Sequence, residues 1–139
     1  MSDAFHGAKL ALFCAGDLIV MRRDDTPGIP WPGAVDFPGG GAEAGETPAD
    51  CVLRELHEEL SIEIPQQRIE WQRAYCAQGH VVWFLVARIS PQERDQIQLG
   101  DEGQAWWIEP VSTFLGRDDA VVHLQNRLRD YLADASKTS

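Results

Sequence analysis

Positive charge is scarce in this sequence: 12 Lys and Arg residues stand against 22 Asp and Glu residues, for a formal net charge of -10 at pH 7. A chain this acidic repels long nucleic acid and anionic membranes, so neither is expected as a partner. It also repels a free nucleotide phosphate. A phosphate-containing substrate would therefore require metal ions and local arginines to offset the repulsion.

Long hydrophobic runs and cysteine pairs are missing as well. No apolar run reaches the roughly 20 residues of a membrane-spanning helix, and no basic region followed by a hydrophobic one suggests a signal peptide at the N-terminus. The three cysteines (Cys14, Cys51 and Cys76) are scattered and lack metal-ligand spacing. We therefore expect a cytoplasmic protein with reduced thiols, a single domain over residues 1–139, and a monomer or homodimer.

Residues 47–60 carry the clearest helix signal. Thr47 suits the N-cap, Pro48 suits the first helical position, and Asp50 completes a capping box. At about 100° per residue, the helix has an apolar core stripe and, beside it, an acidic stripe. The apolar stripe consists of Ala49, Val52, Leu53, Leu56 and Leu60, and the acidic stripe of Glu55, Glu58 and Glu59.

The three glutamates are neighbours on the helix surface because they are three and four residues apart. Their like charges repel, and a hard divalent cation would turn that repulsion into ligation. A glutamate cluster is more often a solvated, salt-bridged face. That simpler interpretation does not explain the FPGGG segment at 37–41, where we expect a glycine turn, or the position of Arg54 directly before Glu55.

The spacing of these residues resembles the signature of the Nudix family. The fixed positions of that signature are Gly40, Glu46, Arg54, Glu55, Leu56, Glu58, Glu59, Ser61 and Ile62, and each matches except Ser61, which replaces a glycine. We expect Ser61 to affect how the helix ends, at a cost of about 1 kcal/mol in a left-handed conformation, and not the chemistry. The resemblance implies an α+β fold, an α/β/α sandwich with a mixed β-sheet between helices.

The same resemblance implies Mg²⁺-dependent hydrolysis of a nucleoside diphosphate linked to another group, with Mn²⁺ as a second possible ion. In that scheme Glu58, Glu59 and the Gly39 carbonyl are the main metal ligands, and Glu55 binds metal or orders metal-bound water. Arg54 orients Glu55 or another carboxylate, because arginine can hold a carboxylate bidentately. Glu46 pairs with Arg54.

Further candidates lie outside the helix. The resemblance implicates Glu102 as the catalytic base or an additional metal ligand, with Asp101 as its competitor and a solvated acidic turn as the simpler alternative. Arg23 and Phe37 are candidate substrate-binding residues, although a surface role explains Arg23 equally well. The base-binding candidates are Asp118 and Asp119, near the start of the last helix, where acids more often serve as N-caps.

Hydrophobic patterning and turn residues predict the other elements. Strands are expected at 8–15, 18–22, 34–37, 69–77, 80–89 and 105–108, with 80–89 as a central strand. Residues 91–100 are expected to be irregular or to form one helical turn, while a short helical turn is expected at 111–115 and a second long helix at 120–134. We expect Trp31 to anchor the Pro- and Gly-rich loop at 24–33 to the core, and a base-stacking role is its alternative.

The expected substrate is a small nucleoside triphosphate, canonical or with an oxidised purine, cleaved to a monophosphate and pyrophosphate. ADP-ribose and dinucleoside polyphosphates stay open as alternatives. A catalytically silent Nudix module that only binds a nucleotide is a further alternative, but such modules usually lose the acids that this sequence retains. An acidic protein-interaction domain explains the charge and leaves the signature unexplained.

Overall fold

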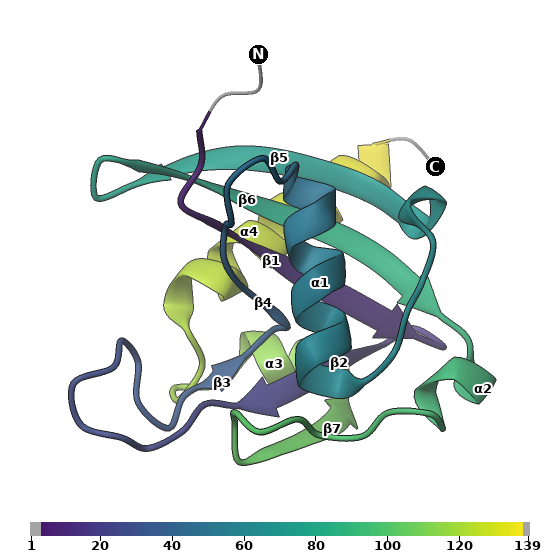
Figure 1. Ribbon diagram of the computed structural model, residues 1–139. Helices are drawn as coiled ribbons and strands as arrows, with labels where there is room; N and C mark the ends of the chain where they lie inside the picture. The colour runs from purple at the N-terminus through teal and green to yellow at the C-terminus, as the bar shows by residue number, and fades with distance from the viewer. Residues whose placement is uncertain (1–3, 138–139) are drawn as a thin grey trace.

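The computed structural model describes residues 4–137, which form a β-sheet covered by helices on both faces (Figure 1). The strands are β1 (Gly7–Cys14), β2 (Asp17–Arg22), β3 (Val35–Asp36), β4 (Gly39–Gly41), β5 (Ile69–Ala77), β6 (His80–Ile89) and β7 (Ala105–Glu109). The helices are α1 (Pro48–Leu60), α2 (Pro91–Arg94), α3 (Val111–Leu115) and α4 (Val122–Lys137), with a 3₁₀ turn at Gln66–Arg68. The α/β/α sandwich expected from the sequence is confirmed.

The sheet is mixed because β1 and β6 run parallel while the other strand pairs are antiparallel. Its order is β3-β2-β1-β6-β5, with β4 also pairing with β1 and β7 with β2. Strand β6 therefore lies between β1 and β5, as its nearly continuous apolar sequence predicted. No helix among residues 4–137 combines the length and the apolar character needed to cross a membrane.

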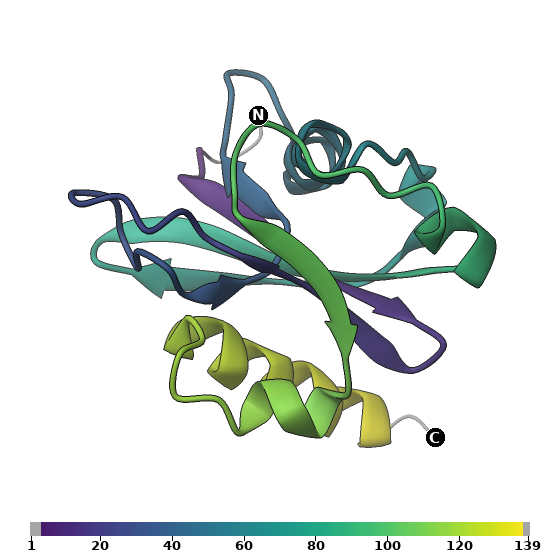
Figure 2. The same ribbon diagram turned by 90° about the horizontal axis from the view of Figure 1, so that it is seen from below.

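Alternating residues of the central strands build two cores, because successive strand side chains point to opposite faces. Figure 2 shows α1 on one side of the sheet and α3 and α4 on the other. From β1, Leu10 and Leu12 pack in the core under α1, whereas Ala11 and Phe13 pack in the core under α4. Both cores are closed by buried helix residues: Val52, Leu56 and Leu60 from α1, and Leu124, Leu128 and Tyr131 from α4.

Helix α1 begins and ends as the sequence predicts. The Thr47 hydroxyl accepts a hydrogen bond from the Asp50 backbone N–H, and the Asp50 carboxylate accepts one from the Thr47 N–H. Ser61 adopts the left-handed conformation, with φ of 62°. Its hydroxyl also donates to the Gln98 carbonyl at 3.0 Å, so this serine ties the loop after α2 to the end of α1.

Two local expectations are wrong. The glycines at 39–41 form strand β4 against Gly7–Lys9 and not merely a turn. Gly39 has φ of 140°, and a Cβ there would lie 2.2 Å from the Ala8 carbonyl oxygen, so only glycine fits this pairing. Trp31 does not anchor its loop in the core: it is 42% exposed and meets the His123 ring edge-on at 5.8 Å.

The last helix also begins later than expected, at Val122. Ala120 forms an isolated parallel bridge with Val35, and the Val121 N–H donates to the Val35 carbonyl at 3.0 Å. These contacts keep the chain extended before α4. They depend on β3, which is far away in the sequence, so the apolar periodicity of the helix could not predict them.

Candidate active site

Arg54 joins the acidic face of α1 to the segment before the helix. It donates to both carboxylate oxygens of Glu46 at 2.7 and 3.1 Å, to Glu55 Oε1 at 3.0 Å and to the Gly41 carbonyl at 2.9 Å. The hydrogen bond from Arg54 holds the pKa of Glu46 below its ordinary value, despite an opposing effect of burial. Both contacts predicted for Arg54, with Glu46 and with Glu55, are present.

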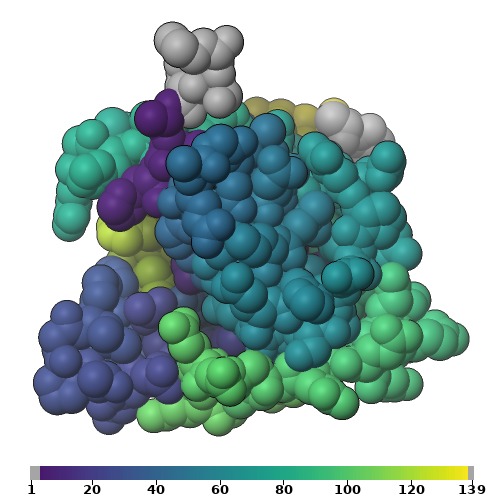
Figure 3. Space-filling model, in the orientation of Figure 1, coloured from purple at the N-terminus to yellow at the C-terminus, as the bar shows by residue number. Residues whose placement is uncertain are grey.

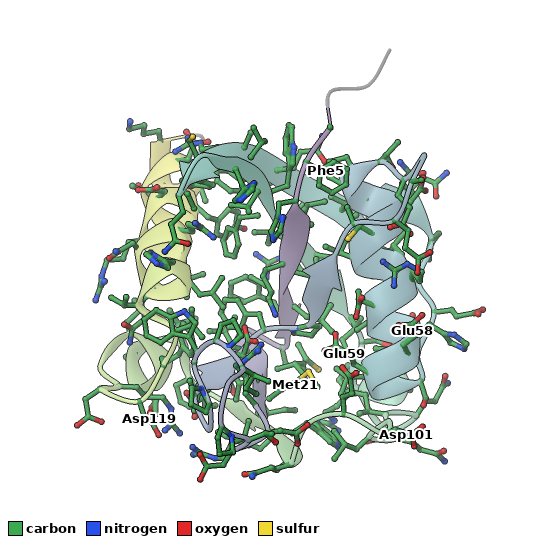
Figure 4. The ribbon with its side chains drawn as sticks, turned by 60° about the vertical axis from the view of Figure 1, so that its left-hand side comes forward. Phe5, Met21, Glu58, Glu59, Asp101 and Asp119 are labelled. Carbon is green, nitrogen blue, oxygen red and sulfur yellow. The ribbon has the colours of Figure 1, made fainter. Side chains whose placement is uncertain are left out.

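Glu59 is the glutamate that points into the molecule. Figure 4 shows its side chain directed from α1 toward Met21, whereas Glu58 points away from the sheet. Glu59 Oε1 accepts a hydrogen bond from the Gly39 N–H at 2.8 Å. Burial raises the pKa of Glu59 to about 7, although the charge of Lys9 and the Gly39 hydrogen bond oppose the shift. Its carboxyl group therefore exchanges its proton near neutral pH.

The other two glutamates of the acidic stripe lie in different surroundings. The Glu55 carboxyl packs against β4 so closely that a Cβ on Gly40 would lie 2.7 Å from it. A side chain at position 40 would therefore displace the Glu55 carboxyl from β4. Glu58 is 56% exposed on its side chain and lies 3.5 Å from Arg54 Nη1. The structure thus brings Glu55 and Glu59 to β4 and leaves Glu58 at the surface.

A polar cavity of about 230 Å³ opens beside Glu59. Figure 3 shows its two bordering loops, 24–34 in blue-violet and 99–104 in green, below the end of α1. The cavity contains four of the predicted site residues: Arg23, Phe37, Glu59 and Glu102. Phe37 is otherwise part of the core, 1% exposed and stacked on Phe114 with ring centroids 4.6 Å apart.

The two base-binding candidates lie elsewhere. Figure 4 places Asp119 on the opposite side from Glu59, near the start of α4. Asp119 accepts from Arg117 at 3.1 Å and pairs with Arg22 at 3.5 Å, while Asp118 is exposed. Both border a shallow hollow beside Trp31, away from the polar cavity. Asp101, the competitor of Glu102, is also exposed and does not border the polar cavity.

Sequence reasoning missed a buried charge cluster next to the cavity. Asp36 Oδ2 accepts hydrogen bonds from Lys9 Nζ and from Arg23 Nη1, both at 2.9 Å. Lys9 Nζ also reaches the Gly39 carbonyl at 3.4 Å. The one signal in the sequence was a lysine inside the apolar run at 8–15, which is unusual in a buried strand.

The donor atoms around Glu59 fit a hard divalent ion by chemistry, because carboxylate and carbonyl oxygens are the ligands that Mg²⁺ prefers. As arranged within residues 4–137, no three His, Cys, Asp or Glu side chains form a group that could hold a metal ion. Arg54 engages Glu55, and Lys9 faces the Gly39 carbonyl. Before these oxygen atoms can bind a metal ion, Arg54 must therefore release Glu55 and Lys9 must release the Gly39 carbonyl.

Comparison with known proteins places this fold and signature in one family. A sequence model of the NUDIX domain matches residues 5–127. The RNA pyrophosphohydrolase of Gluconobacter oxydans is 33% identical over 92 residues, which cover 64% of this chain and 52% of that protein. The chain thus spans about half the length of this curated relative.

Two solved structures share the fold. The MutT protein from Methanosarcina mazei aligns with a TM-score of 0.74 at 17% identity, covering 94% of both chains. An Ap4A hydrolase of C. elegans aligns with a TM-score of 0.73 at 19% identity, covering 94% of this chain and 98% of that one. With the signature in α1 and the family match over residues 5–127, the chain belongs to the NUDIX domain family.

Proposed function

We propose that the protein is a divalent-metal-dependent pyrophosphohydrolase that cleaves a small nucleoside triphosphate, with a canonical or an oxidised purine base, to a monophosphate and pyrophosphate. The observation that carries the proposal is Glu59. Its carboxyl group is buried against Gly39, titrates near neutral pH and borders a cavity that also contains Arg23 and Glu102. An acid, a cation and a second acid around one cavity are the groups that pyrophosphate hydrolysis requires.

The metal of this proposal is Mg²⁺, with Mn²⁺ as a substitute. Its proposed ligands are Glu55, Glu58, Glu59, Glu102 and the Gly39 carbonyl. When bound, a divalent ion neutralises phosphate oxygens and lowers the pKa of a bound water. Glu58 and Glu102 are exposed, so their side chains are free to turn toward an ion.

The protein side chains have separate tasks in this proposal. Arg54 holds Glu55 and Glu46 in place through four hydrogen bonds to these carboxylates and Gly41. Arg23 offers a positive charge to a substrate phosphate in the polar cavity. Glu102 is the proposed base or additional ligand, since it borders the cavity from the loop before β7.

A second candidate substrate is the 5′-triphosphate end of an RNA. The similarity to curated RNA pyrophosphohydrolases favours it. The net charge of -10 opposes it, because neighbouring phosphates of the strand would be repelled. A dinucleoside polyphosphate and ADP-ribose are smaller and carry fewer charges than an RNA, and they belong in the same comparison.

A hydrolysis assay over a nucleotide panel tests the proposal. The panel contains canonical and oxidised nucleoside triphosphates, ADP-ribose, dinucleoside polyphosphates and a short 5′-triphosphate RNA, each with Mg²⁺ and with a chelator. We expect metal-dependent release of pyrophosphate from one triphosphate class. A preference for the RNA at low and moderate salt would favour the second candidate. Failure to hydrolyse any compound, together with nucleotide-dependent thermal stabilisation, would replace the enzyme by a binding module.

A further inference from the structure

Lys9 is one of only two lysines in the sequence, and it lies in the otherwise apolar strand β1. Its ammonium group donates to Asp36 Oδ2 at 2.9 Å and to the carbonyl oxygens of Phe37 and Gly39 at 3.3 and 3.4 Å. The side chain keeps 24% of its surface exposed. This arrangement fixes the end of a flexible side chain that is only partly buried.

Asp36 holds a second cation on the same oxygen atom. Arg23 Nη1 donates to Asp36 Oδ2 at 2.9 Å, while Asp36 Oδ1 accepts the Phe37 backbone N–H at 2.8 Å. The Asp36 side chain is 6% exposed, so its position is fixed by the surrounding protein. One buried carboxylate thus orients two cations, and it neutralises only one of their two charges.

Asp36 and one of its two cations, Arg23, border two cavities. Arg23 and Asp36 border the polar cavity that contains Glu59. They also border a second, mainly apolar cavity of about 340 Å³, which is lined by Lys9 and, at its outer side, by Trp31. A cavity of this volume is at the lower end of the range for small-molecule sites. Lys9 borders only the second cavity, so a ligand group that contacts both cations lies beside Asp36, which borders both cavities.

We propose that Lys9 and Arg23, oriented by Asp36, form a site for a phosphate group of the substrate where Asp36 borders the two cavities. This inference rests on the proposed function and adds Lys9 as a substrate-binding residue. A phosphate has several acceptor oxygens and can take hydrogen bonds from both cations while each keeps its contact with Asp36. The uncharged part of the substrate lies in the apolar cavity, and the next phosphate extends toward Glu59.

The simpler role for Lys9 is to neutralise Asp36, because a buried unpaired carboxylate is costly. Removal of Lys9 alone does not separate the two roles if the variant is unstable. The double variant Lys9→Met/Asp36→Asn does, because it removes both charges and leaves the net charge of the chain unchanged. Because Asp36 also orients Arg23, the double variant is compared with Asp36→Asn alone. A purely neutralising lysine predicts that these two variants bind phosphate compounds alike. A phosphate-binding lysine predicts that the double variant is at least as stable as Asp36→Asn and binds more weakly.

Calorimetric titration with a methylene-bridged, non-hydrolysable nucleoside triphosphate, in the presence of Mg²⁺, tests the proposal. We expect Lys9→Met and Arg23→Met each to weaken binding about tenfold or more, since each loses a charge-assisted hydrogen bond. Lys9→Arg should restore most of the affinity. Lys137→Met, the same substitution at the exposed end of α4, is the matched control and should bind like the wild type.

The outcomes separate this inference from the proposed function. Wild-type affinity in Lys9→Met or in the double variant would overturn the phosphate site, even if the enzyme hydrolyses nucleotides. Weaker binding by Lys9→Met than by the wild type, and by the double variant than by Asp36→Asn, would support the site even if no compound of the hydrolysis panel were cleaved. A wild-type protein that does not bind the analogue at all would overturn the site as well.

Discussion

Replacement of Glu59 by Gln should change how the stability of the protein depends on pH. The glutamine side chain can still accept the Gly39 hydrogen bond, but it never carries a charge. In the folded protein, burial raises the pKa of Glu59 from 4.5 to about 7. Between these two values the folded chain holds a proton that the unfolded chain releases. The free energy of unfolding contributed by Glu59 therefore falls as the pH rises across this window.

A shift of this size corresponds to about 3 kcal/mol, and the partial exposure of Glu59 reduces the expectation to about 2 kcal/mol. Urea denaturation in the presence of a chelator, at pH 4.5 and pH 8, gives the free energy of unfolding of both proteins. The charged neighbours Lys9, Asp36 and Glu55 are common to both, so their titration largely cancels in the difference.

The Gln variant should gain about 2 kcal/mol relative to the wild type between pH 4.5 and pH 8. Addition of Mg²⁺ at pH 8 should then stabilise the wild type more than the variant, because only the wild type offers the carboxylate. A difference between the two proteins that stays constant with pH would show that the Glu59 carboxyl is not held in a desolvated site, and the reasoning would be refuted.

Three further changes test other parts of the structure. Arg54→Lys should lower the free energy of unfolding by about 2 kcal/mol, because lysine cannot bridge Glu46 and Glu55 together. In urea denaturation, a double-mutant cycle with Glu46→Gln should give a coupling energy above about 1 kcal/mol. Additive effects of the two substitutions would contradict the network. Ser61→Gly should leave the free energy of unfolding nearly unchanged, because relief of the left-handed backbone strain offsets loss of the hydrogen bond to Gln98. Ser61→Ala keeps the strain and loses the hydrogen bond, so it should lower the free energy of unfolding by about 1 kcal/mol. Equal thermal stability of the two variants would argue against this balance. Phe37→Leu should lower the free energy of unfolding by about 1–2 kcal/mol, because it loses the stacking contact with Phe114. A large rise in KM at an unchanged melting temperature would instead show that Phe37 binds substrate.

Local signals explain why α1 was predictable. Its N-cap, first-position proline, capping box and left-handed end are all encoded within residues 47–61, and all are present in the structure. The hairpin of β5 and β6 was equally local, since Gln78 and Gly79 both take the positive φ values of a tight turn. The bounds of these elements follow from short-range stereochemistry.

The cluster of Lys9, Arg23 and Asp36 was not predictable in the same way. Lys9 meets Gly39 only through the pairing of β1 with β4, and the triple glycine indicates a turn more directly than a strand. In the sequence, Asp36 looks like an ordinary acidic residue at the edge of a loop. Its position near Arg23 becomes clear only from the pairing of β3 with β2. Charges that face each other across strands depend on strand register, which the sequence patterning of single segments does not report.

The turnover of Glu59→Gln is the most direct test of the proposed role of the α1 glutamates in metal-dependent hydrolysis. Glu63→Gln is the matched control, because Glu63 follows the same helix and its side chain is 81% exposed. Steady-state hydrolysis of the preferred nucleotide with Mg²⁺ should show a loss of several orders of magnitude for Glu59→Gln and near-normal turnover for Glu63→Gln. A folded Glu59→Gln protein with near-normal turnover would contradict the account.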